Sequence, residues 1–213
     1  MRALVVAKAP VAGRVKTRLG AVIGMEAAAR VAAAALLDTL TACRTAFDEC
    51  HLALDGDLRG ARSETAIRDL LQGWTVHPQR GGSLGQRLAH AHADAGGTGP
   101  TVQVGMDTPQ LTAGDLLEVA DASQHGNAVL GPAADGGWWV LALHDPVAAA
   151  CLAEVPMSRA DTYLRTRHAL QRTAQSVAVA RMLRDVDTVA DADAVSSALA
   201  GGHFQRAWRE VVR

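Results

Sequence analysis

RALVVAKAPVAGRVKTRL, residues 2–19, joins an apolar run to a basic loop and then to the start of a helix. The run over 2–7 is rich in Val, Leu and Ala, which is typical of a buried parallel strand. Pro10 and Gly13 predict a loop after it. An Ala-rich stretch over 25–46 then predicts a long helix with Leu residues on its apolar face. The chain therefore opens with a strand, a loop and a helix.

The same alternation continues along the chain and predicts an α/β fold. Alternating strands and helices imply right-handed crossovers and a mostly parallel sheet covered on both faces, a three-layer α/β/α sandwich. No linker or repeat interrupts the pattern, so we expect one domain over 1–213. Further strands are expected at 51–54, 74–77, 101–105, 128–131, 138–143 and 176–183, and helices at 60–72, 86–94, 112–122, 159–173, 189–200 and 204–212.

Composition narrows the possible functions. The formal net charge is −1, which argues against a broad surface for nucleic acid or an anionic membrane. The three cysteines contain no C-x-x-C pair and give no zinc signature. The apolar run at 3–7 is too short for a signal peptide or a membrane span. We expect a cytoplasmic protein, monomeric or homodimeric, without a transmembrane segment or nucleic-acid partner.

The loop over 8–19 carries four cations, Lys8, Arg14, Lys16 and Arg18. Ligands of open α/β sheets bind beyond the carboxyl ends of the strands, so these cations favour a phosphate site. A P-loop would need the lysine directly after its last glycine, and a dinucleotide loop would need more glycines. The alternative interpretation is a solvated basic turn.

Three aspartates stand where they could bind a hard cation such as Mg²⁺. Asp107 follows the strand expected at 101–105, and Asp185 and Asp187 share one side of an extended segment. The alternative is helix capping, by Asp107 before 112–122 or by Asp187 before 189–200. Thr112 is the better placed cap of the first helix.

Two glycine-rich segments complete the candidate site. In the loop QRGGSLGQ, Gly82 and Gly85 would let a nucleobase approach the backbone. In GPAADGGWW, residues 131–139, one of the two tryptophans would face a ligand while the other packs inward. The alternative for this second segment is a hairpin turn followed by a core tryptophan.

In order, the segments AKAPVAGRVKTRL, QRGGSLGQRL, VGMDTPQL, LGPAADGGWWVLAL and RDVDTVADADAV resemble the bacterial glycosyltransferase-A-like family of arsenosugar-biosynthesis-type glycosyltransferases. That family is a neighbour of the 2-phospholactate guanylyltransferases and, more distantly, of the molybdenum-cofactor guanylyltransferases. The resemblance covers residues 3–200 and implies a nucleotide-diphospho-sugar transferase fold of the glycosyltransferase-A type.

The resemblance also implies roles for individual residues. It implies catalytic roles for Lys16, Asp107 and Asp135, and a Mg²⁺ or Mn²⁺ site formed by Asp107, Asp185 and Asp187. The acceptor side would comprise Gly136, Gly137 and Trp138. The nucleotide site would comprise Ala7, Lys8, Ala9, Pro10, Gly13, Arg14, Lys16, Arg18, Gly82 and Gly85.

Departures from the family pattern fall on the acceptor side. Ala134 stands where the family usually has an acid, Trp138-Trp139 replaces a frequent Tyr-Tyr, and 155–158 lacks a frequent Trp. The first hypothesis is sugar transfer from a nucleoside diphosphate sugar to a small or lipid acceptor. The second is nucleotidyl transfer from an NTP to a phosphorylated or phosphonate molecule with pyrophosphate release. The third is a non-catalytic nucleotide-binding module.

Overall fold

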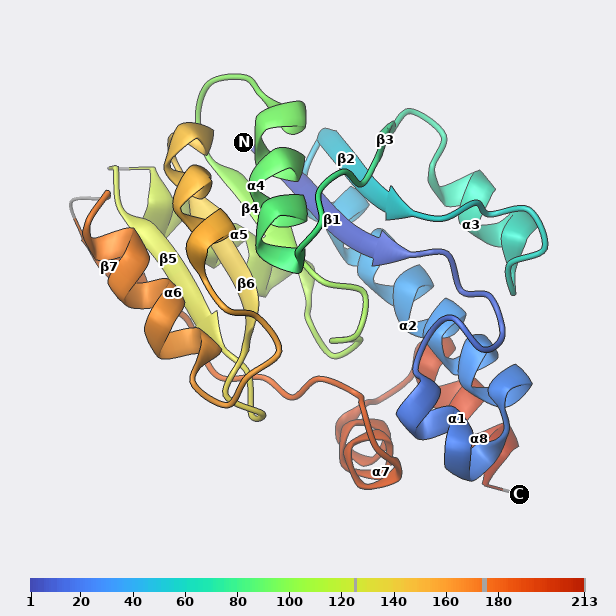
Figure 1. Cartoon of the computed structure of the whole chain (residues 1–213). Coiled ribbons are helices and arrows are strands. Elements are labelled where there is room, and N and C mark those ends of the chain that lie inside the picture. Colours follow the sequence, from blue (N-terminus) through green and yellow to red (C-terminus); the bar gives the residue numbers. More distant parts are fainter. Residues whose placement is uncertain (125, 174–175, 213) are drawn as a thin grey trace.

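The computed structural model describes residues 1–124, 126–173 and 176–212. Its centre is a seven-stranded sheet with the order β3-β2-β1-β4-β6-β5-β7 (Figure 1). β6 is antiparallel to both of its neighbours, β4 and β5, and the other strand pairs are parallel. The predicted mostly parallel sheet is confirmed. The strands are β1 (Arg2–Lys8), β2 (Glu49–Asp55), β3 (Thr75–Pro78), β4 (Thr101–Val104), β5 (Ala128–Pro132), β6 (Trp138–Leu143) and β7 (Val177–Val179).

Helices cover both faces of this sheet, as predicted for a three-layer sandwich. Figure 1 shows α4 and α6 in front of the sheet and α2 behind it. α5 packs beside α2, and the 3₁₀ helix η1 packs between α4 and α6. The helical elements are α1 (Thr17–Ile23), α2 (Met25–Ala46), α3 (Glu64–Leu70), α4 (Leu84–Ala95), α5 (Ala113–Ser123), η1 (Pro146–Glu154), α6 (Thr162–Gln171), α7 (Val189–Ala198) and α8 (His203–Val211).

The alternation of side chains along β1 explains why this strand is central. Ala3 and Val5 point into the core shared with Leu36 of α2, whereas Leu4 packs against Ala91 of α4. A strand that is covered on both faces needs apolar residues at every position, which is the composition of residues 2–7. Full burial of one leucine stabilises the fold by roughly 1.5–3 kcal/mol.

Several element boundaries differ from those predicted. β7 ends at Val179, and beyond it an isolated parallel bridge joins Ala133 to Leu183. α6 starts at Thr162, three residues later than predicted, because the backbone of Asp161 (φ −109°, ψ 10°) is not helical. The sequence pattern missed η1, whose Ala-rich segment has little amphipathic character. In the described part of the chain, no helix is long and apolar enough to cross a membrane.

Candidate functional site

A large cleft lies where the strand order of the sheet reverses. β1 leads to β2 and β3 on one side, and β4 leads to the remaining strands on the other. Ligands of open α/β sheets bind at such a switch point, beyond the carboxyl ends of the strands. The cleft there has a volume of about 810 Å³, which is within the usual range for small-molecule sites.

Residues from all the predicted motifs line this cleft, although the glycine-rich loop contributes Gln79 and Leu84 and not its glycines. The lining includes the end of β1, the basic loop, the segment after β4, the β5–β6 turn and the segment before α7. Among the predicted site residues, those that line it are Ala7, Lys8, Arg14, Lys16, Arg18, Asp107, Asp135, Gly137, Trp138, Asp185 and Asp187.

Lys16 links two of the acids that line the cleft. Its ammonium donates to Asp107 Oδ2 at 2.9 Å and to Asp187 Oδ1 at 2.7 Å. The side chain is only 10% exposed. Burial lowers the pKa of Lys16, but the two carboxylates outweigh that effect and raise it to about 12. Lys16 therefore stays charged and is shared between two acids that are distant in sequence.

Asp187 is held by a second cation from the same loop. Its Oδ2 accepts a hydrogen bond from Arg18 at 2.7 Å, and Arg18 itself is 78% exposed. The helix that follows is capped by Thr188, whose hydroxyl accepts from the Asp191 amide. Capping therefore does not explain Asp187, whose carboxylate points into the cleft.

Asp107 does not cap a helix either. Thr112 caps α5 in a reciprocal capping box with Asp115, as predicted for that threonine. The Asp107 carboxylate instead accepts from Lys16. The alternative of a solvated basic turn does not describe Lys16, whose side chain is 10% exposed and paired with two acids, whereas Arg14 and Arg18 are exposed.

Asp185 completes the group of acids. Its Oδ1 accepts a hydrogen bond from Thr108 Oγ1 at 3.0 Å. Burial and then the nearby negative charge of Asp107 raise the pKa of Asp185 to about 7. Burial beside a second carboxylate favours the neutral form of an acid, and this is the environment of Asp185.

Backbone contacts hold the two acidic segments together. The Val186 amide donates to the Asp107 carbonyl at 2.9 Å, and the Gln110 side-chain amide donates to the Arg184 carbonyl at 2.7 Å. The segment after β4 and the segment before α7 thus form one frame. All three carboxylates belong to these two segments, although Asp107 and Asp185 are 78 positions apart in the sequence.

The opposite wall of the cleft comes from the β5–β6 turn and the segment before α6. Asp135 accepts from the Gly137 amide at 2.8 Å, so it both shapes the predicted hairpin turn and lines the cleft. Trp138 lines the cleft, whereas Trp139 is buried. A side chain at Gly136 would collide with the carbonyl of Ala160, so this turn packs directly against the segment before α6.

Six predicted residues lie outside the lining: Ala9, Pro10, Gly13, Gly82, Gly85 and Gly136. Gly85 has a packing role, because a side chain there would collide with the carbonyl of Leu152 in η1. The Gly82 amide donates to the Gln86 side chain at 2.9 Å, in the cap of α4. Packing therefore explains the glycine at position 85, whereas the hydrogen bond at position 82 does not require a glycine.

The sequence reasoning missed several polar residues that line the cleft, among them Gln79, Arg87 and Gln103. The Gln79 amide donates to the carbonyls of Ala7 and Ala53, both at 2.9 Å. Gln103 was detectable as a glutamine between two valines of a predicted strand. Gln79 and Arg87 flank the glycine-rich loop, where charge and polarity alone give little signal.

The three acids have the ligand atoms that a hard cation prefers, but their side chains are not arranged around a common point. Asp107, Asp185 and Asp187 offer carboxylate oxygens, the ligands that Mg²⁺ and Mn²⁺ prefer. Within residues 1–124, 126–173 and 176–212, however, no three His, Cys, Asp or Glu side chains converge in a metal-binding geometry. Lys16 lies between two of the three carboxylates.

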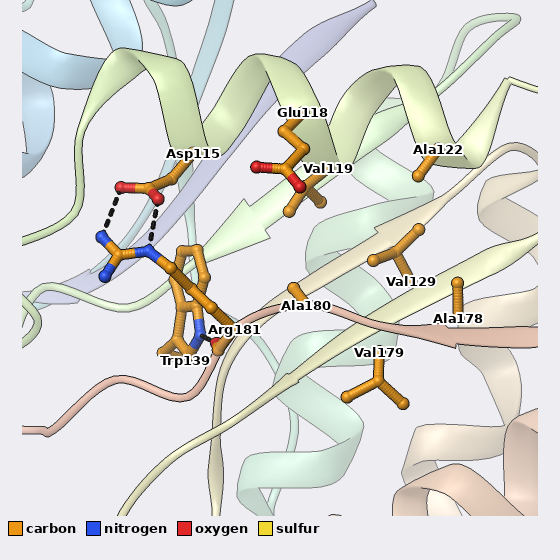
Figure 2. A pocket seen from close by; sticks show the side chains of 10 residues that line it. All are labelled: Asp115, Glu118, Val119, Ala122, Val129, Trp139, Ala178, Val179, Ala180 and Arg181. Carbon is orange, nitrogen blue, oxygen red and sulfur yellow. Dashed lines mark hydrogen bonds and ion pairs between the residues drawn. The ribbon is translucent and has the colours of Figure 1, made fainter.

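A second, smaller hollow lies on the other face of the sheet and shares no residue with this site. Figure 2 shows it between α5 and β7, with the Asp115–Arg181 ion pair at one end. Its volume of about 90 Å³ is too small for a nucleotide. Asp115 is also committed to capping α5.

Comparisons with known proteins show the family of this chain and its fold. The family model described as "Uncharacterized protein conserved in bacteria (DUF2064)" matches residues 37–159, more than half of the chain. The chain belongs to this family. No curated protein matches the sequence, so relatives of this DUF2064 member come from solved structures.

One similar structure is a protein of Desulfovibrio desulfuricans G20, provisionally assigned as a nucleotide-diphospho-sugar transferase. It is 26% identical with a TM-score of 0.85, over 98% of this chain and 94% of that chain. The DUF2064 chain thus has a nucleotide-diphospho-sugar transferase-like fold. Two more distant structures show the fold alone. Rv0371c of Mycobacterium tuberculosis H37Rv, in complex with manganese, is 19% identical with a TM-score of 0.58, over 93% of this chain and 99% of that chain. A Methanothermobacter nucleotidyl transferase is 17% identical with a TM-score of 0.54, over 97% of this chain and 98% of that chain.

Proposed function

We propose that this protein is a metal-dependent glycosyltransferase that uses a nucleoside diphosphate sugar as donor and a small or lipid molecule as acceptor. The observation that carries the proposal is the convergence of Lys16 and Arg18 with Asp107 and Asp187 at the switch point of the sheet. The provisional assignment of the Desulfovibrio structure supports the donor class.

The basic loop and the acids would act together on the donor diphosphate. Lys16 and Arg18 are placed to neutralise the leaving nucleoside diphosphate, which is the group that gains charge in the transition state. Asp107, Asp185 and Asp187 would hold the Mg²⁺ or Mn²⁺, which supplies additional charge neutralisation at the diphosphate. The manganese complex of Rv0371c shows that one protein of this fold binds such an ion.

The opposite wall is the proposed acceptor side. Asp135 lines the cleft and takes part in no ion pair of the described residues, so its carboxylate is available to orient or deprotonate an acceptor hydroxyl. Trp138 donates its indole N–H to Thr166 at 3.1 Å. That bond fixes the ring at the wall, where the ring can pack against an acceptor.

Nucleotidyl transfer is the second candidate, and the late pair of acids favours it. Asp185 and Asp187 stand on the same frame as Asp107, an arrangement that suits a cation bound to the α-phosphate of an NTP. The acceptor would then be a phosphorylated or phosphonate molecule, and pyrophosphate would leave. A non-catalytic nucleotide-binding module fits less well, because Asp107, Asp185 and Asp187 line the same cleft as the basic loop.

Product analysis separates the two reactions. The full chain is incubated with Mn²⁺, NDP-sugars or NTPs, and a panel of alcohols and phosphorylated hydroxy acids. We expect acceptor-dependent release of the nucleoside diphosphate without pyrophosphate, and loss of this release in Asp107→Asn. Asp94→Asn is the matched control, because Asp94 pairs with Arg80 outside the cleft. Pyrophosphate release would establish the second reaction, and no turnover or binding of any donor would reject both.

A further inference from the structure

The ammonium of Lys16 occupies the place of a bound cation. It contacts one oxygen of Asp107 and one of Asp187, two carboxylates that come from different segments of the chain. The remaining oxygen of Asp187 pairs with Arg18. Side-chain cations thus satisfy three of the four oxygens on these two acids.

We propose that Lys16 is an intramolecular cation for Asp107 and Asp187, and that a divalent cation binds by exchange with its ammonium. The exchange frees Lys16 to bind the diphosphate of the donor. This inference rests on the proposed function and specifies how its site is regulated. The same exchange would precede either of the two candidate transfer reactions.

The Lys16 ammonium and a divalent metal ion cannot both contact the same carboxylate oxygens. Mg²⁺ and Mn²⁺ need about six oxygen ligands, with distances near 2.0–2.1 Å for Mg²⁺. The Lys16 ammonium is within 2.9 Å of one oxygen on each of the two carboxylates. A divalent cation bound to the same oxygens would therefore face a positive charge at close range, and like charges so close repel strongly.

Lys16 can move while its backbone stays in place. Its backbone has a positive φ of 46° at the start of α1, and the Gly20 amide donates to the Lys16 carbonyl at 2.7 Å. The side chain has four rotatable carbons and a compact ammonium, so the charge can swing without refolding the loop. The rest of the cleft, open beside Asp107 and Asp187, provides the space.

A consequence of the exchange is reciprocal coupling between metal and donor. When the Lys16 ammonium moves to a bound diphosphate, the carboxylates of Asp107 and Asp187 become free to bind a metal. Conversely, a metal bound to these carboxylates displaces the ammonium, which can then bind the diphosphate. Each ligand must then raise the affinity for the other by the same factor. The nucleotide-free protein should accordingly bind the metal weakly.

The lysine content of the chain makes the exchange measurable in the unmodified protein. Lys8 and Lys16 are the only two lysines in the sequence, and both line the cleft. Trace acetylation of the full chain followed by peptide mass spectrometry gives the labelling of Lys16 relative to Lys8. We expect this ratio to rise severalfold when Mn²⁺ replaces EDTA, and to stay constant in Asp187→Asn. A ratio that Mn²⁺ does not change in the wild type, under conditions where Mn²⁺ binds, would overturn the exchange.

Direct Mn²⁺ binding, followed by the electron paramagnetic resonance of free Mn²⁺, gives the second test. Without nucleotide, Lys16→Met should bind Mn²⁺ about tenfold more tightly than the wild type, since a hydrogen-bonded charge pair has been removed from the ligands. Arg80→Met is the matched control and should leave Mn²⁺ affinity unchanged, because Arg80 pairs with Asp94 outside the cleft. Equal or weaker binding by Lys16→Met would overturn the exchange and leave the proposed function standing. No Mn²⁺ binding by any form, with or without nucleotide, would reject both.

Discussion

Replacement of Thr108 by Val should weaken the acidic site while leaving the fold in place. The hydroxyl of Thr108 is buried and donates to Asp185 at 3.0 Å. Valine has the same shape but no donor, so Asp185 would lose this hydrogen bond. The frame itself should remain, because the bonds from Val186 to Asp107 and from Gln110 to Arg184 do not involve the hydroxyl.

The size of the effect follows from the charge on the acceptor. A hydrogen bond to a charged group contributes about 1.5–3 kcal/mol, and outer partners of metal ligands typically change metal affinity about 10- to 100-fold. We therefore expect Mn²⁺ affinity in the presence of nucleotide to fall within that range. Urea unfolding of the metal-free protein should show a smaller loss, about 1 kcal/mol, because the pKa of Asp185 near 7 leaves it only partly charged.

Isothermal titration calorimetry with Mn²⁺ on the nucleotide-bound protein measures this affinity. Thr108→Ser is the matched control, since it retains the hydroxyl and should bind Mn²⁺ within a few-fold of the wild type. Equal Mn²⁺ affinity in Thr108→Val and the wild type would show that Asp185 is not oriented by Thr108, or that it does not bind the metal.

Two further predictions concern stability. Gly85→Ala should destabilise the protein by about 1–3 kcal/mol in urea unfolding, because the new methyl group would collide with the Leu152 carbonyl. Gly82→Ala is the control: its methyl group has ordinary contact distances and should change stability by less than about 0.5 kcal/mol. Equal effects of the two substitutions would refute this packing argument. Burial lowers the pKa of His92 to about 4, so the unfolded chain binds the proton first as the pH falls below about 6.5. Stability should then fall by up to about 1.4 kcal/mol per pH unit between pH 6 and 5, and a fall of the same steepness in His92→Gln would exclude this histidine as the cause.

Much of the site was predictable because sheet topology brings strand ends together. Residues that follow β1 and β4 lie at the same edge of the sheet, so a basic loop and an acid in these positions must become neighbours. Asp187 joins them because the segment before α7 returns to that edge and pairs with residue 107. The alternation of the two tryptophans likewise followed from the period of a strand.

Side-chain partners over long sequence distances could not be predicted in the same way. The pattern placed Lys16 among phosphate-binding cations, but its two carboxylate partners are 91 and 171 residues away. Gly85 was predicted to lie beside a nucleobase. The sequence of a glycine-rich loop is the same whether its glycines make room for a ligand or for a neighbouring carbonyl group. η1, the neighbour that requires this glycine, has no periodic apolar pattern and was itself not predicted.

Calorimetric titration of nucleoside diphosphates into the wild type and Asp187→Asn, each with Mn²⁺ and with EDTA, tests the central claim most directly. Asp187 contacts both Lys16 and Arg18, and it is also a proposed metal ligand. We predict that at least one diphosphate binds the wild type, that Mn²⁺ strengthens this binding, and that Asp187→Asn loses the strengthening. Binding that is the same in Mn²⁺ and EDTA, or no binding of any nucleotide by the wild type, would contradict a metal-assisted nucleotide site in this cleft.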